Sequence, residues 1–173
     1  MIRTERLELI PATVELTRAA LAGAAPLGAA LAATVPRGWP PQYLDVSALQ
    51  CTLDRLIEMP EQADWWMYFV VLPDGPSGRT LVGTAGYKGP PSDGGTVEVG
   101  YGIVPDYQRR GYASEAVRGL LARAFGVPGV QQAIAETLPE LTPSIGVLRK
   151  CGFQLVGEGS EPGVIRFALP RPT

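Results

Sequence analysis

The spacing of apolar and polar positions in this chain changes repeatedly between the periods of strands and of helices. Residues 6–10, Arg-Leu-Glu-Leu-Ile, alternate with a period of two and predict a short opening strand closed by Pro11. Thr13 is a suitable N-cap, so we expect a helix from there to about Ala22 and a second short helix over residues 27–33.

A proline-rich linker and a third helix follow. Residues 35–41 predict a rigid loop. Either Asp45 or Ser47 is expected to cap the next helix, whose apolar stripe consists of Leu49, Leu53, Leu56 and Ile57.

The middle of the chain is richest in predicted strands. Residues 65–72 are almost continuously apolar and aromatic, which is typical of a strand covered on both faces. A turn over 74–78 and a strand over 80–87 predict a hairpin. A second turn over 89–95 leads into a strand over 96–104.

The second half reads as alternating helices and strands. Helical spacing predicts a helix whose buried face is formed by Ala113, Ala116, Val117, Leu120, Leu121, Ala124 and Phe125. Residues 132–137 should then form a strand parallel to 96–104, because a helix separates them. A helix over 144–150 and strands over 153–156 and 164–169 close the pattern. We expect an α/β fold with one mixed sheet of six or seven strands and helices on both faces.

Composition narrows this picture to one domain over residues 1–173. The chain is 46% apolar, enough for a continuous core at this length. Its net charge of -2 provides no basic field for nucleic acid. With no apolar run long enough to span a bilayer and no apolar signal-type segment at its start, we expect a cytoplasmic protein without membrane association.

The chain has no histidine, which restricts its chemistry. Catalytic Ser-His-Asp and Cys-His arrangements are excluded, and the commonest transition-metal ligand is missing. Cys51 and Cys151 are too far apart in sequence for a C-x-x-C site, so we expect no metal. Carboxylates, hydroxyls and backbone groups must carry any reaction.

The segment 99–116, V-G-Y-G-I-V-P-D-Y-Q-R-R-G-Y-A-S-E-A, passes from an apolar strand through a basic turn into a helix. The first four N–H groups of a helix have no intrahelical partner, and the helix dipole adds roughly half a positive charge there. Gly111 lets the backbone approach a ligand closely. The segment therefore predicts a binding site for a diphosphate.

Residues 108–113, Gln-Arg-Arg-Gly-Tyr-Ala, match the fingerprint Q/R-x-x-G-x-G/A of the acyl-CoA site in the GNAT superfamily of N-acetyltransferases. Residues 136–140, 144–145 and 147–153 resemble the second half of that site in the ribosomal-protein and small-amine branches. The resemblance implies the GNAT fold, acetyl-CoA as co-substrate and, frequently, a homodimer, although no residue establishes a dimer.

The resemblance also assigns the cofactor contacts. Backbone groups at Ile103 and Val104 are expected to pair with the pantetheine arm. The diphosphate is expected at Gln108, Arg109, Arg110, Gly111, Tyr112, Ala113 and Ser114.

Two residues are candidates for the chemistry of acetyl transfer. Glu98 is the candidate general base, since small residues flank it along one strand face; the alternative is a solvated or ion-paired strand glutamate. Ser144 is expected near the cofactor sulfur as a hydrogen-bond donor to the thiolate or to the pantetheine, or else as a helix cap. Tyr101 and Tyr112 are alternative proton donors.

The acceptor side is expected around Trp39 and Gly102. Trp39 lies on a loop that borders the acceptor pocket in the family, although a buried anchor for the loop is the alternative. Gly102 stands where the related branch carries a bulky aromatic residue, and would widen this side. Leu141 replaces an asparagine that usually binds pantetheine, and Gly146 replaces a longer residue.

These features predict an N-acetyltransferase that moves an acetyl group directly to a primary amine, either of a small molecule or of a protein N-terminus. The alternative is a non-catalytic acyl-CoA-binding sensor with the same fold.

Overall fold

The computed structural model describes residues 1–172. It contains one eight-stranded sheet, in the order β1-β2-β3-β4-β5-β6-β8-β7. The strands are β1 (Ile2–Arg3), β2 (Glu8–Pro11), β3 (Met67–Gly75), β4 (Gly78–Tyr87), β5 (Thr96–Ile103), β6 (Gln132–Thr137), β7 (Gln154–Glu158) and β8 (Ile165–Pro170). The helices are α1 (Val14–Ala22), α2 (Ala24–Leu31), α3 (Val46–Glu58), α4 (Tyr112–Phe125) and α5 (Thr142–Lys150), with short 3-10 helices η1 (Pro60–Trp65) and η2 (Pro105–Tyr107).

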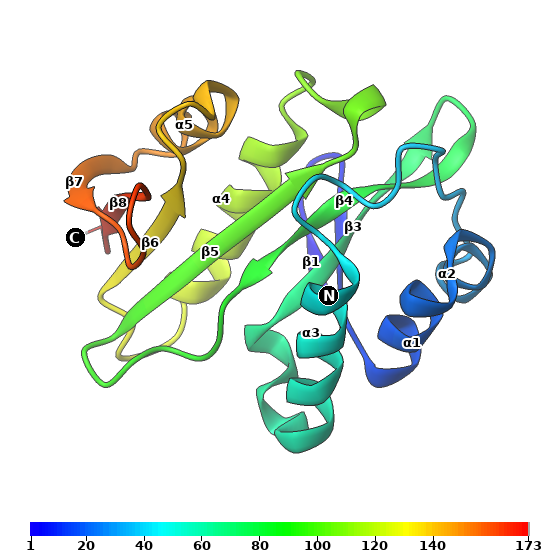
Figure 1. The fold of residues 1–173 in the computed structure, drawn as a ribbon, viewed down its shortest axis with the longest axis horizontal. Coiled ribbons are helices and arrows are strands. Elements are labelled where there is room, and N and C mark those ends of the chain that lie inside the picture. Colours follow the sequence, from blue (N-terminus) through cyan, green and yellow to red (C-terminus); the bar gives the residue numbers. More distant parts are fainter. Residues whose placement is uncertain (173) are drawn as a thin grey trace.

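Helices cover both faces of the sheet, as predicted, with α1, α2 and α3 on one face and α4 on the other (Figure 1). Alternate residues of β3 enter two separate cores. Tyr68 and Val70 pack in the cluster that contains α4, whereas Phe69 and Val71 pack in the cluster of α1–α3. The continuous apolar run therefore reflects burial on both faces.

The predicted caps of the first and third helices are present. Thr13 Oγ1 accepts a hydrogen bond from the Leu16 amide at 3.1 Å. Of the two candidates before α3, Asp45 is the cap, with its Oδ1 2.8 Å from the Ala48 amide. Ile57 was wrongly predicted to lie on the buried stripe of α3, because it is 53% exposed.

The strand count exceeds the six or seven predicted. β1 has only two residues, too few for a periodic pattern, and it pairs with β2 through Ile2 and Leu9. The predicted strand at Trp65 begins later, at Met67, since Trp65 ends η1. None of the helices within residues 1–172 is both long and apolar enough to cross a membrane.

Strands β5 and β6 are parallel, as predicted, but they pair only over Thr96–Glu98 and Gln132–Ile134. Beyond these residues the two strands diverge, with α4 behind the gap (Figure 1). β5 stays paired with β4 as far as Ile103, and β6 stays paired with β8. The sheet therefore opens in its middle, on the side where β5 leads into the basic turn.

Candidate functional site

The turn between β5 and α4 presents a row of unused backbone amides. Arg109 and Gly111 both have positive φ, 61° and 83°. The first helical hydrogen bond runs from the Glu115 amide to the Gly111 carbonyl at 3.0 Å. Within residues 1–172, the amides from Arg109 to Ser114 donate to no protein acceptor. This is the arrangement that stabilises an anion at a helix start.

Side chains of the basic turn hold its shape. Gln108 Nε2 donates to the Ile103 carbonyl at 2.9 Å, tying the turn to the end of β5. Arg110 donates to the Asp106 carbonyl at 3.0 Å, and its guanidinium lies 5.3 Å from the centre of the Tyr107 ring. Gln108 and Arg110 thus fix the backbone that carries the amides, beyond any charge that Arg110 supplies.

The two predicted pantetheine contacts at the strand end differ. The Val104 amide donates to the Val82 carbonyl at 3.0 Å and is therefore not available to a ligand, so a contact of Val104 with the pantetheine arm stays a prediction. Gly83 pairs with Ile103, and antiparallel ladders alternate between bonded and non-bonded pairs. The N–H and C=O groups of Ile103 and Tyr101 therefore point away from β4, towards the gap.

A cavity of about 350 Å³ occupies the gap between the diverging strands. Its lining comes from β5, β6, α5, the β7–β8 turn and the segments next to β4 and α3. Its lining is Tyr43, Lys88, Val99, Gly100, Tyr101, Ala135, Glu136, Thr137, Leu138, Leu141, Ser144, Leu148, Ser160, Glu161 and Val164. The predicted residues Ser144, Tyr101 and Leu141 thus line one cavity.

Ser144 and Tyr101 are hydrogen-bonded to each other in this cavity. The Tyr101 hydroxyl lies 3.0 Å from the Ser144 carbonyl and 3.1 Å from Ser144 Oγ. Leu141, and not Ser144, is the N-cap of α5, so the capping alternative for Ser144 is wrong. Burial raises the pKa of Tyr101 to about 12, although the hydrogen bond with Ser144 opposes this effect. Tyr112, the other candidate donor, is buried under Arg6, away from the cavity.

Glu98 forms an ion pair with Lys88 at the edge of the cavity. The Glu98 side chain is 22% exposed, whereas Lys88 is 60% exposed and lines the cavity. Glu98 lies on the strand face shared with Gly100 and Gly102, as predicted from alternation. Its carboxylate is therefore ion-paired in the free protein.

The open position on this face is Gly100, and the expectation that Gly102 widens the acceptor side was wrong. A Cβ at Gly102 would lie 3.2 Å from Cβ of Pro41, whereas a Cβ at Gly100 would meet no heavy atom within 4 Å. Trp39 packs in the α1–α3 core with its ring centre 6.2 Å from that of Phe69. The aromatic residue of this loop that lines the cavity is Tyr43.

Glu136 holds the β7–β8 turn over the cavity, a role that sequence analysis missed. Its carboxylate accepts hydrogen bonds from the Ser160 amide at 2.9 Å, from Ser160 Oγ at 2.6 Å and from Arg166 Nε at 2.8 Å. Burial raises the pKa of Glu136, but these hydrogen bonds and the Arg166 charge outweigh burial and keep the pKa below its ordinary value. The same turn presents Glu161 and Val164 to the cavity.

We expect this carboxylate to make the protein acid-sensitive. The lowered pKa means that the unfolded state binds a proton more readily, so Glu136 stabilises the fold above its ordinary pKa and loses this effect as the pH falls. Urea unfolding at pH 7 should show that Glu136→Gln lowers the free energy of unfolding by roughly 1–3 kcal/mol. Between about pH 5 and pH 3, the free energy of unfolding should fall less for Glu136→Gln than for wild type. Glu158→Gln, at an exposed position of β7, is the control. Equal acid sensitivity in Glu136→Gln and wild type would contradict this role.

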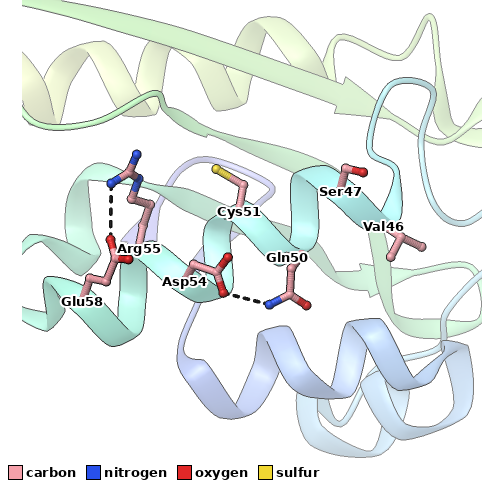
Figure 2. A pocket seen from close by; sticks show the side chains of 7 residues that line it. All are labelled: Val46, Ser47, Gln50, Cys51, Asp54, Arg55 and Glu58. Carbon is pink, nitrogen blue, oxygen red and sulfur yellow. Dashed lines mark hydrogen bonds and ion pairs between the residues drawn. The ribbon is translucent and has the colours of Figure 1, made fainter.

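A second hollow, of about 520 Å³, lies along the outer surface of α3 (Figure 2). All of its lining residues come from that one helix. Gln50 donates to Asp54 at 2.8 Å, and Arg55 pairs with Glu58 at 3.3 Å. Four of its polar side chains thus pair with each other, and none of its lining residues was predicted as a site residue, so the gap between β5 and β6 is the candidate functional site.

The decisive comparison is a family model: residues 6–154 match that of the acetyltransferase (GNAT) domain. This chain belongs to the GNAT family. The matched stretch includes the basic turn, the gap and α5. Within residues 1–172 no group of three His, Cys, Asp or Glu side chains is placed to hold a metal ion.

Relatives of this GNAT chain agree with that assignment. The uncharacterized N-acetyltransferase YnaD of Bacillus subtilis is 39% identical over 62 residues, 36% of each chain. The match spans between 36% and 45% of the length of the three curated relatives. A GNAT-family acetyltransferase structure from Bacillus anthracis has a TM-score of 0.65 at 21% identity, covering 98% of both chains.

RimL, a ribosomal L7/L12 alpha-N-protein acetyltransferase solved in complex with coenzyme A, is also similar in structure. Its TM-score is 0.69 at 14% identity, with 96% of this chain and 95% of that chain covered. At such identities the two structures establish the fold alone.

Proposed function

We propose that the protein is an acetyl-CoA-dependent N-acetyltransferase that acts directly on a primary amine of a small molecule or of a protein N-terminus. The observation that carries the proposal is the row of free amides from Arg109 to Ser114 beside a cavity in the split sheet. The amides would bind the diphosphate, and the Ile103 amide, which faces the gap, would pair with the pantetheine arm. Family membership supports this use of the turn.

In this reaction the amine nitrogen attacks the thioester carbon, the C–S bond breaks, the nitrogen loses a proton and the thiolate gains one. An alkylamine with a pKa near 10.4 is almost wholly protonated at pH 7, so a base is needed. Glu98 is our candidate, acting directly or through water. It requires Lys88 to move aside, because the Lys88 ammonium occupies this carboxylate in the free protein.

The Ser144–Tyr101 pair would receive the leaving thiolate. A hydroxyl carries one proton, so if Tyr101 donates to the Ser144 carbonyl, the Ser144 hydroxyl is free to donate to the phenol or to a ligand. Full proton transfer from a phenol with a pKa of about 12 to a thiolate whose thiol has a pKa near 8.5 is unfavourable by on the order of a thousandfold. We therefore assign Tyr101 to positioning Ser144 and stabilising the thiolate.

Removing the Tyr101 hydroxyl should lower kcat about 10-fold while the KM for acetyl-CoA stays within about twofold, because one hydrogen bond is lost near the sulfur. Steady-state thiol release by Tyr101→Phe measures both parameters. Tyr68→Phe, which loses a phenol hydrogen bond to the Asp64 carbonyl outside the cavity, is the matched control. An unchanged kcat in Tyr101→Phe would remove this role.

Filling the open position should block the acceptor and spare the cofactor. We expect Gly100→Leu to fold normally and bind coenzyme A within about threefold of wild type, while kcat/KM for the amine falls at least about 10-fold. Gly102→Leu must displace Pro41 and should lose stability as well. Equal amine kinetics in Gly100→Leu and wild type would place the acceptor elsewhere.

The proposal as a whole is tested by incubating the protein with acetyl-CoA and a panel of amines and peptides while following thiol release. Amine-dependent release supports it. The alternative, a non-catalytic acyl-CoA sensor, is favoured by the ion pair that occupies Glu98. Tight coenzyme A binding without release above background would establish that alternative, and absence of binding would reject both.

A further inference from the structure

The segment between β1 and β2 is hydrogen-bonded to the first turn of α4 through Glu115. Thr4 Oγ1 donates to Glu115 Oε1 at 2.6 Å, and the Arg6 amide donates to the same oxygen at 2.7 Å. Arg6 Nε and Nη2 both lie 2.7 Å from Glu115 Oε2. A turn in which the Thr4 amide donates to the Leu7 carbonyl at 2.9 Å, with Leu7 buried, fixes where Arg6 points.

The Arg6 guanidinium also touches the basic turn itself. Its Nη1 donates to the Arg110 carbonyl at 3.1 Å, and its carbon lies 4.8 Å from the centre of the Tyr112 ring. In a planar trans peptide the C=O and the following N–H point in opposite directions. By holding the Arg110 carbonyl, Arg6 therefore turns the Gly111 amide away from itself, to the opposite side of that peptide.

The ion pair between Arg6 and Glu115 also changes the charge at the start of α4. Glu115 lies in the first turn of α4, where its carboxylate would repel a diphosphate bound at the same helix end. Burial raises the pKa of Glu115, but the hydrogen bonds from Thr4 and Arg6 and the Arg6 charge outweigh burial and keep the pKa below its ordinary value. The carboxylate is thus ionised, and the Arg6 guanidinium neutralises it.

We propose that Arg6 is a positioning residue for the diphosphate-binding turn: it aims the Gly111 amide and cancels the Glu115 charge without itself touching the substrate. The inference rests on the proposed function of this turn. A helical glycine lets the segment lie this close to α4, because a Cβ at Gly119 would come 2.9 Å from Thr4 Cγ2.

The test compares acetyl-CoA with S-acetylpantetheine, which has the same thioester but no diphosphate. Arg6→Met should raise the KM for acetyl-CoA about 10-fold and leave kcat and the kinetics with S-acetylpantetheine within about twofold. Arg6→Lys keeps the positive charge but loses the planar guanidinium. Its KM for acetyl-CoA should lie between those of wild type and Arg6→Met. Arg3→Met is the matched control, since it removes an exposed cation next to the same segment.

Arg6→Met/Glu115→Gln should recover part of the affinity for acetyl-CoA, because the uncompensated carboxylate is gone. Calorimetry with coenzyme A separates the possible failures. If wild type takes up no coenzyme A, the proposed function fails. If wild type binds and the Arg6 variants bind equally well, or lose both thioesters equally, the positioning role of Arg6 is overturned. Should Arg6→Met not fold, Arg6→Lys and Glu115→Gln carry the same comparison.

Discussion

We expect Gly111→Val to raise the dissociation constant for coenzyme A by about 30-fold or more, the largest loss of cofactor binding from any single change in this protein. Gly111 has φ 83°, where a side chain costs about 1–2 kcal/mol and a β-branched one costs more. A new Cβ would also lie 3.3 Å from the Arg6 guanidinium. Relaxing either strain rotates the amides that face the anion, and each charge-assisted hydrogen bond lost is worth roughly 1.5–3 kcal/mol.

Gly129→Val is the matched control for this experiment. Gly129 has φ 91° and an open surrounding, so valine there brings similar backbone strain in the loop after α4, at the other end of the helix. Calorimetric titration with coenzyme A and thermal unfolding should be measured for both variants. Affinities within about threefold of each other would mean that the turn shape does not govern binding.

Turnover should depend most strongly on Glu98. We expect Glu98→Gln to lower kcat at pH 7 by about 100-fold, within the usual range for a general base. The loss should shrink towards pH 9–10, because each pH increment of one makes about ten times more of the neutral amine available without the base. Thiol release over pH 6–10 measures this profile.

Lys88→Gln distinguishes a base from a merely structural ion pair. It removes the same Lys88–Glu98 contact but keeps the carboxylate. If Glu98 is the base, Lys88→Gln retains turnover and Glu98→Gln does not. Equal losses in both variants, or a Glu98→Gln profile parallel to that of wild type, would remove Glu98 from the reaction.

The diphosphate-binding turn could be predicted well from the sequence, because it is formed by residues that are adjacent in the chain. The strand, the turn with Gly111 and the helix start are set by neighbouring residues, so the motif and its periodicity carry the information. The parallel pairing of β5 and β6 followed from the intervening helix. The two-residue strand β1 was missed, because no period is defined over two positions.

The acceptor side was predicted less well because distant segments build it. The space beside Gly102 is filled by Pro41, some sixty positions earlier in the chain, and no local pattern reports that contact. In the same way, the partners of Glu98 and Glu136 lie on other strands or turns. Trp39 illustrates the ambiguity of an isolated aromatic residue, because it packs against Phe69, which lies thirty positions later on β3.

The divergence of β5 from β6 gives this sheet an edge in its interior. The backbone groups of Tyr101 and the Ile103 amide face the gap as they would on an outermost strand, and such edges bind an extended segment that can complete the ladder. A ligand arm carrying amides would act as a surrogate strand, and at one hundred times its dissociation constant would add about 2.7 kcal/mol to the stability of the fold. Saturation with such a ligand should therefore reduce aggregation on heating, because it covers the exposed edge of β5 in the gap.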